Sequence, residues 1–153
     1  MRIEELVNDI TAYIIERAED LSIESLAYIY NIHIAFNHIQ SCYMNKNGND
    51  IIFIKFGTEQ EMWHSFAHEL GHYFLHVGNQ RDMRPSYTAM QEYEADKFAL
   101  LFMMPERLIV EYNLFDVESI MNYFRVSQEH ATKRVEMLIN RAKSNKLVGL
   151  ERV

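Results

Sequence analysis

The sequence predicts an α+β fold in which a small sheet, containing an antiparallel hairpin, packs on a mainly helical body. Three observations lead to this prediction. Apolar residues recur at helical spacing over most of the chain, a stretch between residues 32 and 56 has the pattern of strands, and an Asn-Gly turn divides that stretch. The 153 residues, 48% hydrophobic and 24% charged, suit one ordinary globular domain.

Residues 1–57 are expected to form two helices and the sheet. Apolar residues from Ile3 onward recur every three or four positions and predict an amphipathic helix to about Ala18. Ser22 can cap a second short helix, which runs through Tyr30, because its hydroxyl can accept a backbone N–H of the first turn. A strand follows, since residues 32–36 alternate between apolar and other side chains.

A hairpin completes the expected sheet. Segments 40–44 and 50–56 flank the turn-rich run Asn-Lys-Asn-Gly-Asn, in which Asn47-Gly48 can adopt positive φ angles. The second of these strands is apolar on both faces, so we expect it to be central in the sheet or covered on both sides.

Residues 58–104 are expected to form two helices. Thr58 and Glu61 make a capping box for the first helix, which runs to Val77 and ends at Gly78. The polar stretch 78–86 is expected to form a surface loop. A second capping box, Thr88 with Gln91, is expected to begin a helix that continues to about Met103.

Residues 105–153 are expected to form the C-terminal helices. A short helix should follow Pro105 and end near Asn113, and Asp116 and Ser127 are candidate caps for two more, the last ending near Lys143. We expect the last helix to pack through four apolar residues: Ala131, Val135, Leu138 and Ile139.

The same segment also resembles half of a helix-turn-helix, in which Lys133 and Arg134 would contact phosphates. Its glutamates and the net charge of -7 argue against a DNA-binding regulator, so we expect no direct nucleic-acid partner. No apolar run approaches the roughly 20 residues of a membrane span, and the first residues do not form a signal peptide. With a single cysteine, Cys42, these features predict a cytoplasmic protein.

The stretch Thr58–Val77 places four histidines on one face of its helix: His64, His68, His72 and His76. Three overlapping pairs have the i, i+4 spacing at which two imidazoles can bind one metal ion. Only the pair His68 and His72 has a glutamate directly after its first histidine, in the HExxH pattern of residues 68–72. Glu69 can serve there as a general base, so we predict His68 and His72 as ligands. We expect the outer two histidines to be non-ligands that line the rim of the site, support a ligand or simply pack.

A catalytic zinc needs a third protein ligand, and the next helix offers Glu92 and Glu94. They lie about 200° apart on a helix, so they cannot share a face. Asp96 follows Glu92 by one turn, and this pair can serve together. We therefore predict Glu92 as the third ligand, with Asp96 accepting the N–H of the outer nitrogen of His68 or His72.

Other interpretations remain beside this one. HExxH also occurs by chance, and the two histidines could form a structural zinc site, although such sites usually include cysteines. The residue that stabilises the oxyanion stays open among Tyr87, His64 and Arg84.

The motifs HELGHYFLH (68–76) and EYEADKFALLFMMP (92–105), with flanking segments from about Ser22 to Leu138, resemble the ImmA/IrrE family of zinc-dependent metallopeptidases. The resemblance implies a minimal, gluzincin-like zincin domain over residues 1–153, Zn²⁺ held by His68, His72 and Glu92, and Glu69 as catalytic base. It further implies cleavage of a helix-turn-helix repressor in a mobile element, prophage or stress response. The alternative is a non-catalytic module that binds a repressor, with a structural metal or none.

Overall fold

The structure, a computed structural model, describes residues 2–76 and 85–144. The chain divides into two compact units, Leu21–Ala99 and the combination of Met1–Asp20 with Leu100–Val153. Each unit is described by itself, and one metallopeptidase domain over the whole chain stays a prediction. The architecture is mixed α+β, as predicted. None of the described helices is both long and apolar enough to cross a membrane.

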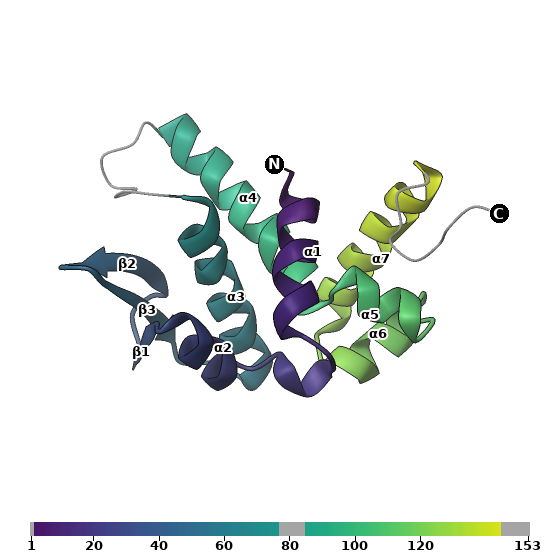
Figure 1. The fold of residues 1–153 in the computed structure, drawn as a ribbon. Coiled ribbons are helices and arrows are strands. Elements are labelled where there is room, and N and C mark those ends of the chain that lie inside the picture. The colour runs from purple at the N-terminus through teal and green to yellow at the C-terminus, as the bar shows by residue number, and fades with distance from the viewer. Residues whose placement is uncertain (1, 77–84, 145–153) are drawn as a thin grey trace. The chain divides into compact units, whose positions relative to one another are not determined.

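The unit Leu21–Ala99 contains the sheet and the helices around it (Figure 1). Its elements are, in chain order, α2 (Ile23–Tyr30), β1 (His33–Asn37), β2 (Cys42–Lys46), β3 (Asn49–Lys55), α3 (Glu59–Leu75) and the first part of α4 (Pro85–Met103). Ser22 caps α2 by accepting the N–H of Ser25 at 3.1 Å, which confirms the predicted cap.

The three strands are arranged in the order β1-β3-β2. β2 and β3 form the predicted antiparallel hairpin, with Cys42 opposite Phe53. Asn47 and Gly48 both have positive φ, 53° and 81°, as a tight hairpin turn requires. β3 is central, as its apolar faces predicted, and it also pairs in parallel with β1, which the sequence pattern did not indicate.

The capping box of α3 is present as predicted. The Thr58 hydroxyl accepts the N–H of Glu61 at 3.1 Å, and the Glu61 carboxylate accepts the N–H of Thr58 at 2.8 Å. The helix ends at Leu75, because His76 already has extended backbone angles, φ -127° and ψ 132°. The expected end at Gly78 lies outside the described residues.

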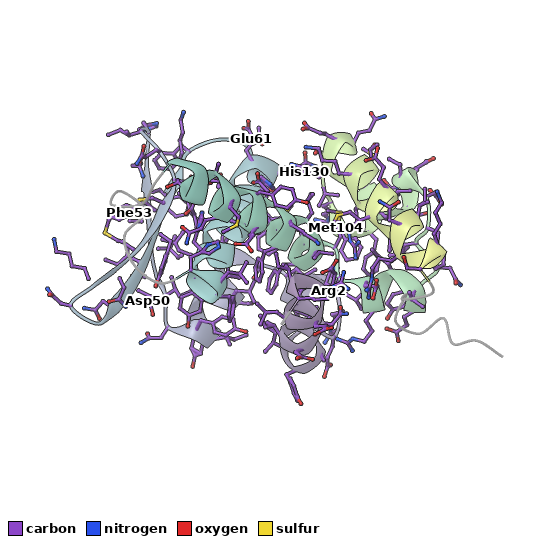
Figure 2. All side chains as sticks on the ribbon, turned by 90° about the horizontal axis from the view of Figure 1, so that it is seen from above. Arg2, Asp50, Phe53, Glu61, Met104 and His130 are labelled. Carbon is purple, nitrogen blue, oxygen red and sulfur yellow. The ribbon has the colours of Figure 1, made fainter. Side chains whose placement is uncertain are left out.

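α3 packs against β3 and β2, and the buried residues described in this unit are mostly apolar. Ile52 and Ile54 of β3 and Phe66 and Leu70 of α3 are fully buried. Figure 2 shows the side chains of the described residues, among which Asp50 and Phe53 mark β3 and Glu61 marks the first turn of α3. The sheet therefore supports the helix that carries the HExxH motif.

α4 begins at Pro85, before the position that the sequence suggested. The predicted Thr88–Gln91 capping box is wrong because Thr88 lies inside the helix, and the predicted loop is wrong at Pro85 and Ser86. Proline is favoured in the first helical turn, where its fixed φ suits the helix and its missing N–H costs no hydrogen bond. Pro85 therefore marks the start of α4.

The second unit is helical in its described part. It contains α1 (Ile3–Ile14), the 3₁₀ turn η1 (Ala18–Asp20), the end of α4, α5 (Glu106–Glu111), α6 (Val117–Phe124) and α7 (Gln128–Lys143). Asp116 and Ser127 cap α6 and α7, as predicted. α1 ends four residues before Ala18, because the carboxylate of Asp20 accepts the N–H groups of Glu16 and Arg17, at 2.9 and 3.2 Å, and so stabilises a turn.

The inward face of α7 differs from the prediction. Ala131 and Leu138 are buried as expected, but Ile139 is 49% exposed and Arg134 is fully buried. The Nε of Arg134 donates to the carbonyl oxygen of Met104 at 2.9 Å. The alternative in which Arg134 contacts a phosphate is therefore wrong, since this guanidinium is inside the protein.

Candidate metal site

Helices α3 and α4 approach each other closely at Gly71, inside the HExxH motif. A Cβ added at Gly71 would lie 3.2 Å from the Cα of Ala95 and 3.2 Å from the Cβ of Phe98. Ala95 is fully buried at this contact, and its small side chain lets the two helices come close. This contact brings the acidic segment of α4 against the histidines of α3.

Three side chains from these helices converge. The Nε2 of His68 lies 2.8 Å from Oε2 of Glu92, and the Nε2 of His72 lies 2.9 Å from Oε1 of the same carboxylate. One potential ligand atom from each residue lies within 4.8 Å of the others. The structure thus brings together the three residues that the sequence predicted as ligands.

The chemistry of these three groups suits a divalent metal ion. Two imidazole nitrogens and one carboxylate are the protein ligands of one known class of catalytic zinc sites, and bonds of about 2.0–2.2 Å require ligand atoms about 3.3 Å apart in a tetrahedron. The His68 and His72 side chains are 14% and 4% exposed, whereas Glu92 is 45% exposed. The site therefore has a buried wall formed by α3 and an accessible side at α4.

Asp96 supports His68 directly. Its Oδ1 lies 2.7 Å from Nδ1 of His68, the nitrogen on the opposite side of the ring from Glu92. A carboxylate in this position orients the imidazole and keeps Nε2 available as a ligand. Of the two histidines that the sequence offered as partners of Asp96, the structure places His68 against it.

His72 has a different support, which includes His76, one of the two outer histidines predicted as non-ligands, and Glu94, which the sequence interpretation passed over. Its Nδ1 lies 2.9 Å from Nδ1 of His76, and Nε2 of His76 lies 3.0 Å from Oε1 of Glu94. Glu94 therefore contacts the histidine face although it lies about 200° from Glu92 around an ideal helix. The i, i+4 spacing of His72 and His76 was visible, but the position of Glu94 depends on how the two helices cross.

Glu69 lies beside the cluster and is 7% exposed. Its carboxylate accepts the backbone N–H of Tyr43, which belongs to the edge strand β2. Burial, opposed by the charge of His68 and reinforced by that of Glu92, raises the pKa of Glu69 to about 7. The carboxylate predicted as the base is thus held between the HExxH helix and the edge of the sheet.

The two candidate ligand imidazoles have opposite pKa shifts in the metal-free chain. Burial lowers the pKa of His68, but the hydrogen bond with Asp96 and the charges of Glu69, Asp96 and Glu92 outweigh it and raise this pKa to about 9. Burial lowers the pKa of His72 to about 4 although the charge of Glu92 acts to raise it, and the charges of His68 and His76 act in the same direction as burial. The two rings therefore differ in environment although they are one turn apart.

Of the three candidates for stabilising the oxyanion, the structure describes the side chain of His64. The ring of His64 is 6.4 Å from that of His68, centroid to centroid. Arg84 and the side chain of Tyr87 lie outside the described parts. The choice among the three stays a prediction.

The fold and the site define an α+β protein with a candidate His-His-Glu metal centre built on an HExxH helix. The family model described as Peptidase M78, IrrE N-terminal-like domain, matches residues 31–136, and the chain belongs to this family. The resemblance to the ImmA/IrrE metallopeptidases is thereby confirmed.

Two proteins of Bacillus subtilis (strain 168) are similar to this chain. The phage-like element PBSX protein XkdA is 33% identical over 89 residues, which are 55% of this chain and 45% of XkdA. The protein YqaB is 25% identical over 129 residues, which are 80% of this chain and 75% of YqaB. The chain thus spans less than half the length of XkdA and three quarters of that of YqaB.

Proposed function

We propose that this protein is a zinc-dependent endopeptidase. The observation that carries the proposal is the convergence of His68, His72 and Glu92 around one position, with Glu69 following the first of them in sequence. Membership of the Peptidase M78 family supports the same conclusion. In this proposal the first three residues hold Zn²⁺, and bound zinc supplies Lewis-acid chemistry that activates water and polarises the scissile carbonyl.

Glu69 is the proposed general base. It takes a proton from the attacking water and passes it to the leaving amine, so that one carboxylate serves both halves of the hydrolysis. Its position beside the two candidate ligand histidines supports this role, as does its burial, which keeps the carboxylate away from bulk solvent. Asp96 orients the His68 ring and takes no part in the proton transfer.

The edge of the sheet supports the proposal that the substrate is a polypeptide. β2 is an edge strand of the described sheet, with β3 on one side, and Glu69 hydrogen-bonds to its backbone at Tyr43. An exposed edge can pair with an extended peptide through main-chain hydrogen bonds. A substrate segment that pairs with the other backbone groups of β2 would therefore run past the proposed base.

We further propose a helix-turn-helix transcriptional repressor as the substrate, so that cleavage relieves repression. The resemblance to the ImmA/IrrE family suggests this class of substrate. The similarity to a protein of a phage-like element supports a setting in a mobile element or prophage.

The test is incubation with a repressor encoded beside this protein, with and without a chelator, followed by mass spectrometry of the products. We expect cleavage by the zinc-loaded protein, none after chelation, and none by Glu69→Gln, which keeps all three proposed ligands. Glu118→Gln makes the same charge change on an exposed residue of α6 and should cleave normally. Cleavage by Glu69→Gln would exclude the proposed base, and a stable complex without cleavage would favour a repressor-binding module.

A further inference from the structure

We propose that His76 and Glu94 are positioning residues that fix the tautomer of His72, so that its Nε2 presents a lone pair to the metal ion. The inference rests on the metal site of the proposed function and extends it to two residues outside the HExxH pattern. It assigns a role to the fourth histidine of the α3 segment and to the acid of α4 that does not contact His68 or His72.

The evidence is a continuous line of polar contacts that leads away from the site. Nδ1 of His72 lies 2.9 Å from Nδ1 of His76, and Nε2 of His76 lies 3.0 Å from Oε1 of Glu94. The side chains of His72 and His76 are only 4% and 8% exposed, while Glu94 is 36% exposed at the outer end. Two buried rings are therefore linked to a carboxylate that reaches solvent.

When a metal binds His72, only one arrangement of protons gives each of these two contacts one donor and one acceptor. A ligand nitrogen must be unprotonated, so Nδ1 of His72 carries the proton and donates it to Nδ1 of His76. His76 must then accept at Nδ1 and carry its own proton at Nε2, which donates to Glu94. The carboxylate, which only accepts, thus sets the tautomers of both rings.

The end of α3 explains how His76 reaches this position. α3 stops at Leu75, and His76 is extended, although its N–H still donates to the carbonyl of His72 at 2.9 Å. Its ring is therefore held one turn beyond His72, close to Glu94 and 5.0 Å from the His72 ring between centroids. With both nitrogens engaged, His76 serves as support for a ligand, a role that Asp96 has directly for His68.

The first experiment measures zinc affinity by competition with a chromophoric chelator. We expect His76→Phe to weaken Zn²⁺ binding about 10- to 100-fold, as loss of a ligand's hydrogen-bond partner typically does. Glu94→Gln should weaken it less, because the amide oxygen still accepts a hydrogen bond. The double variant should bind no more weakly than His76→Phe, since Glu94 acts through His76. The control Glu136→Gln, an exposed residue of α7, should bind as the wild type does.

The outcomes separate this inference from the proposed function. If the wild type binds zinc and His76→Phe binds it with the same affinity, the inference is wrong and the proposed metal site is unaffected. Additive losses of affinity in the double variant would have the same consequence. If the wild type binds no zinc, both fail.

A second experiment uses the wild type alone, so its result does not depend on whether a variant folds. Imidazole ¹⁵N NMR of the zinc-loaded wild type should show a proton on Nδ1 of His72 and on Nε2 of His76. A proton on Nδ1 of His76 would overturn the inference, whereas a merely structural role would not determine which nitrogen carries it.

Discussion

Gly71 of α3 lies directly against Ala95 of α4, where a Cβ on the glycine would be 3.2 Å from the Cα of the alanine. That neighbour is backbone, which cannot rotate away as the end of a flexible side chain can. The separation of the two helices is therefore set at this point. Because α3 carries His68 and His72 and α4 carries Glu92, the same contact sets the dimensions of the candidate metal site.

Substitution Gly71→Ala should consequently weaken both stability and zinc binding. In an ordinary helix interior this change stabilises by roughly 1 kcal/mol, but overpacking here should cost about 1–3 kcal/mol. Urea unfolding and a zinc titration measure the two effects. The reverse change at an exposed position of α4, Ala89→Gly, should lose about 1 kcal/mol and leave zinc affinity unchanged. A stabilised Gly71→Ala protein with normal zinc affinity would show that the contact is loose.

The capping box of α3 should make stability depend on pH. Hydrogen bonds from the backbone and side chain of Thr58 lower the pKa of Glu61 from its ordinary 4.5. The stabilisation from Glu61 is thus present above pH 4.5 and is lost as pH falls through the lowered pKa.

Comparison of the wild type with Glu61→Gln in urea at several pH values tests this. The difference in free energy of unfolding should be greatest near neutral pH and should shrink toward zero well below pH 4.5. Glu59→Gln, in the same helical turn, leaves the capping box intact and should differ less from the wild type. A difference that does not vary with pH would contradict the assignment of the charge to the cap.

The buried arginine of α7 should be dispensable for stability. Nη1 and Nη2 of Arg134 have no hydrogen-bond partner among the described residues, and burial lowers the pKa of the guanidinium to about 10, so it is charged at neutral pH. Replacing a poorly satisfied buried charge by an apolar side chain of similar size is often neutral or stabilising, by about 1–4 kcal/mol. We therefore expect Arg134→Met to unfold at equal or higher urea concentration.

Loss of the neighbouring acid should have the opposite effect. Glu106 forms a two-point ion pair with Arg141, at 2.9 and 3.0 Å, and its charge also favours the charged form of Arg134. Glu106→Gln should cost about 3–5 kcal/mol, and less in the Arg134→Met background because one buried cation is then absent. Equal costs in both backgrounds would show that Glu106 does not interact with Arg134.

Features determined by neighbouring residues could be predicted from the sequence. The Thr58–Glu61 box, the Asn47-Gly48 turn and the HExxH spacing each depend on residues within one or two turns of chain. Glu92 and Asp96 could be predicted because one helical turn separates them, so that both can face a single partner helix.

Features that depend on packing could not be predicted in this way. The parallel pairing of β1 with β3, the burial of Arg134 in place of Ile139 and the contact of Glu94 with His76 all arise from how distant segments meet. An arginine on a helix is normally expected at the surface, and no local pattern indicates that the carbonyl of Met104 accepts its hydrogen bond inside the protein.

The acids of α4 alternate along the chain, and each of them meets an imidazole of the α3 segment. Glu92, Glu94 and Asp96 would repel one another on an isolated helix, and the histidines would lack defined orientations without them. A designer who moved the HExxH helix alone into a new scaffold would transfer two ligands without the groups that orient them. The transferable module is the pair of helices, including the glycine-to-alanine contact that sets their spacing.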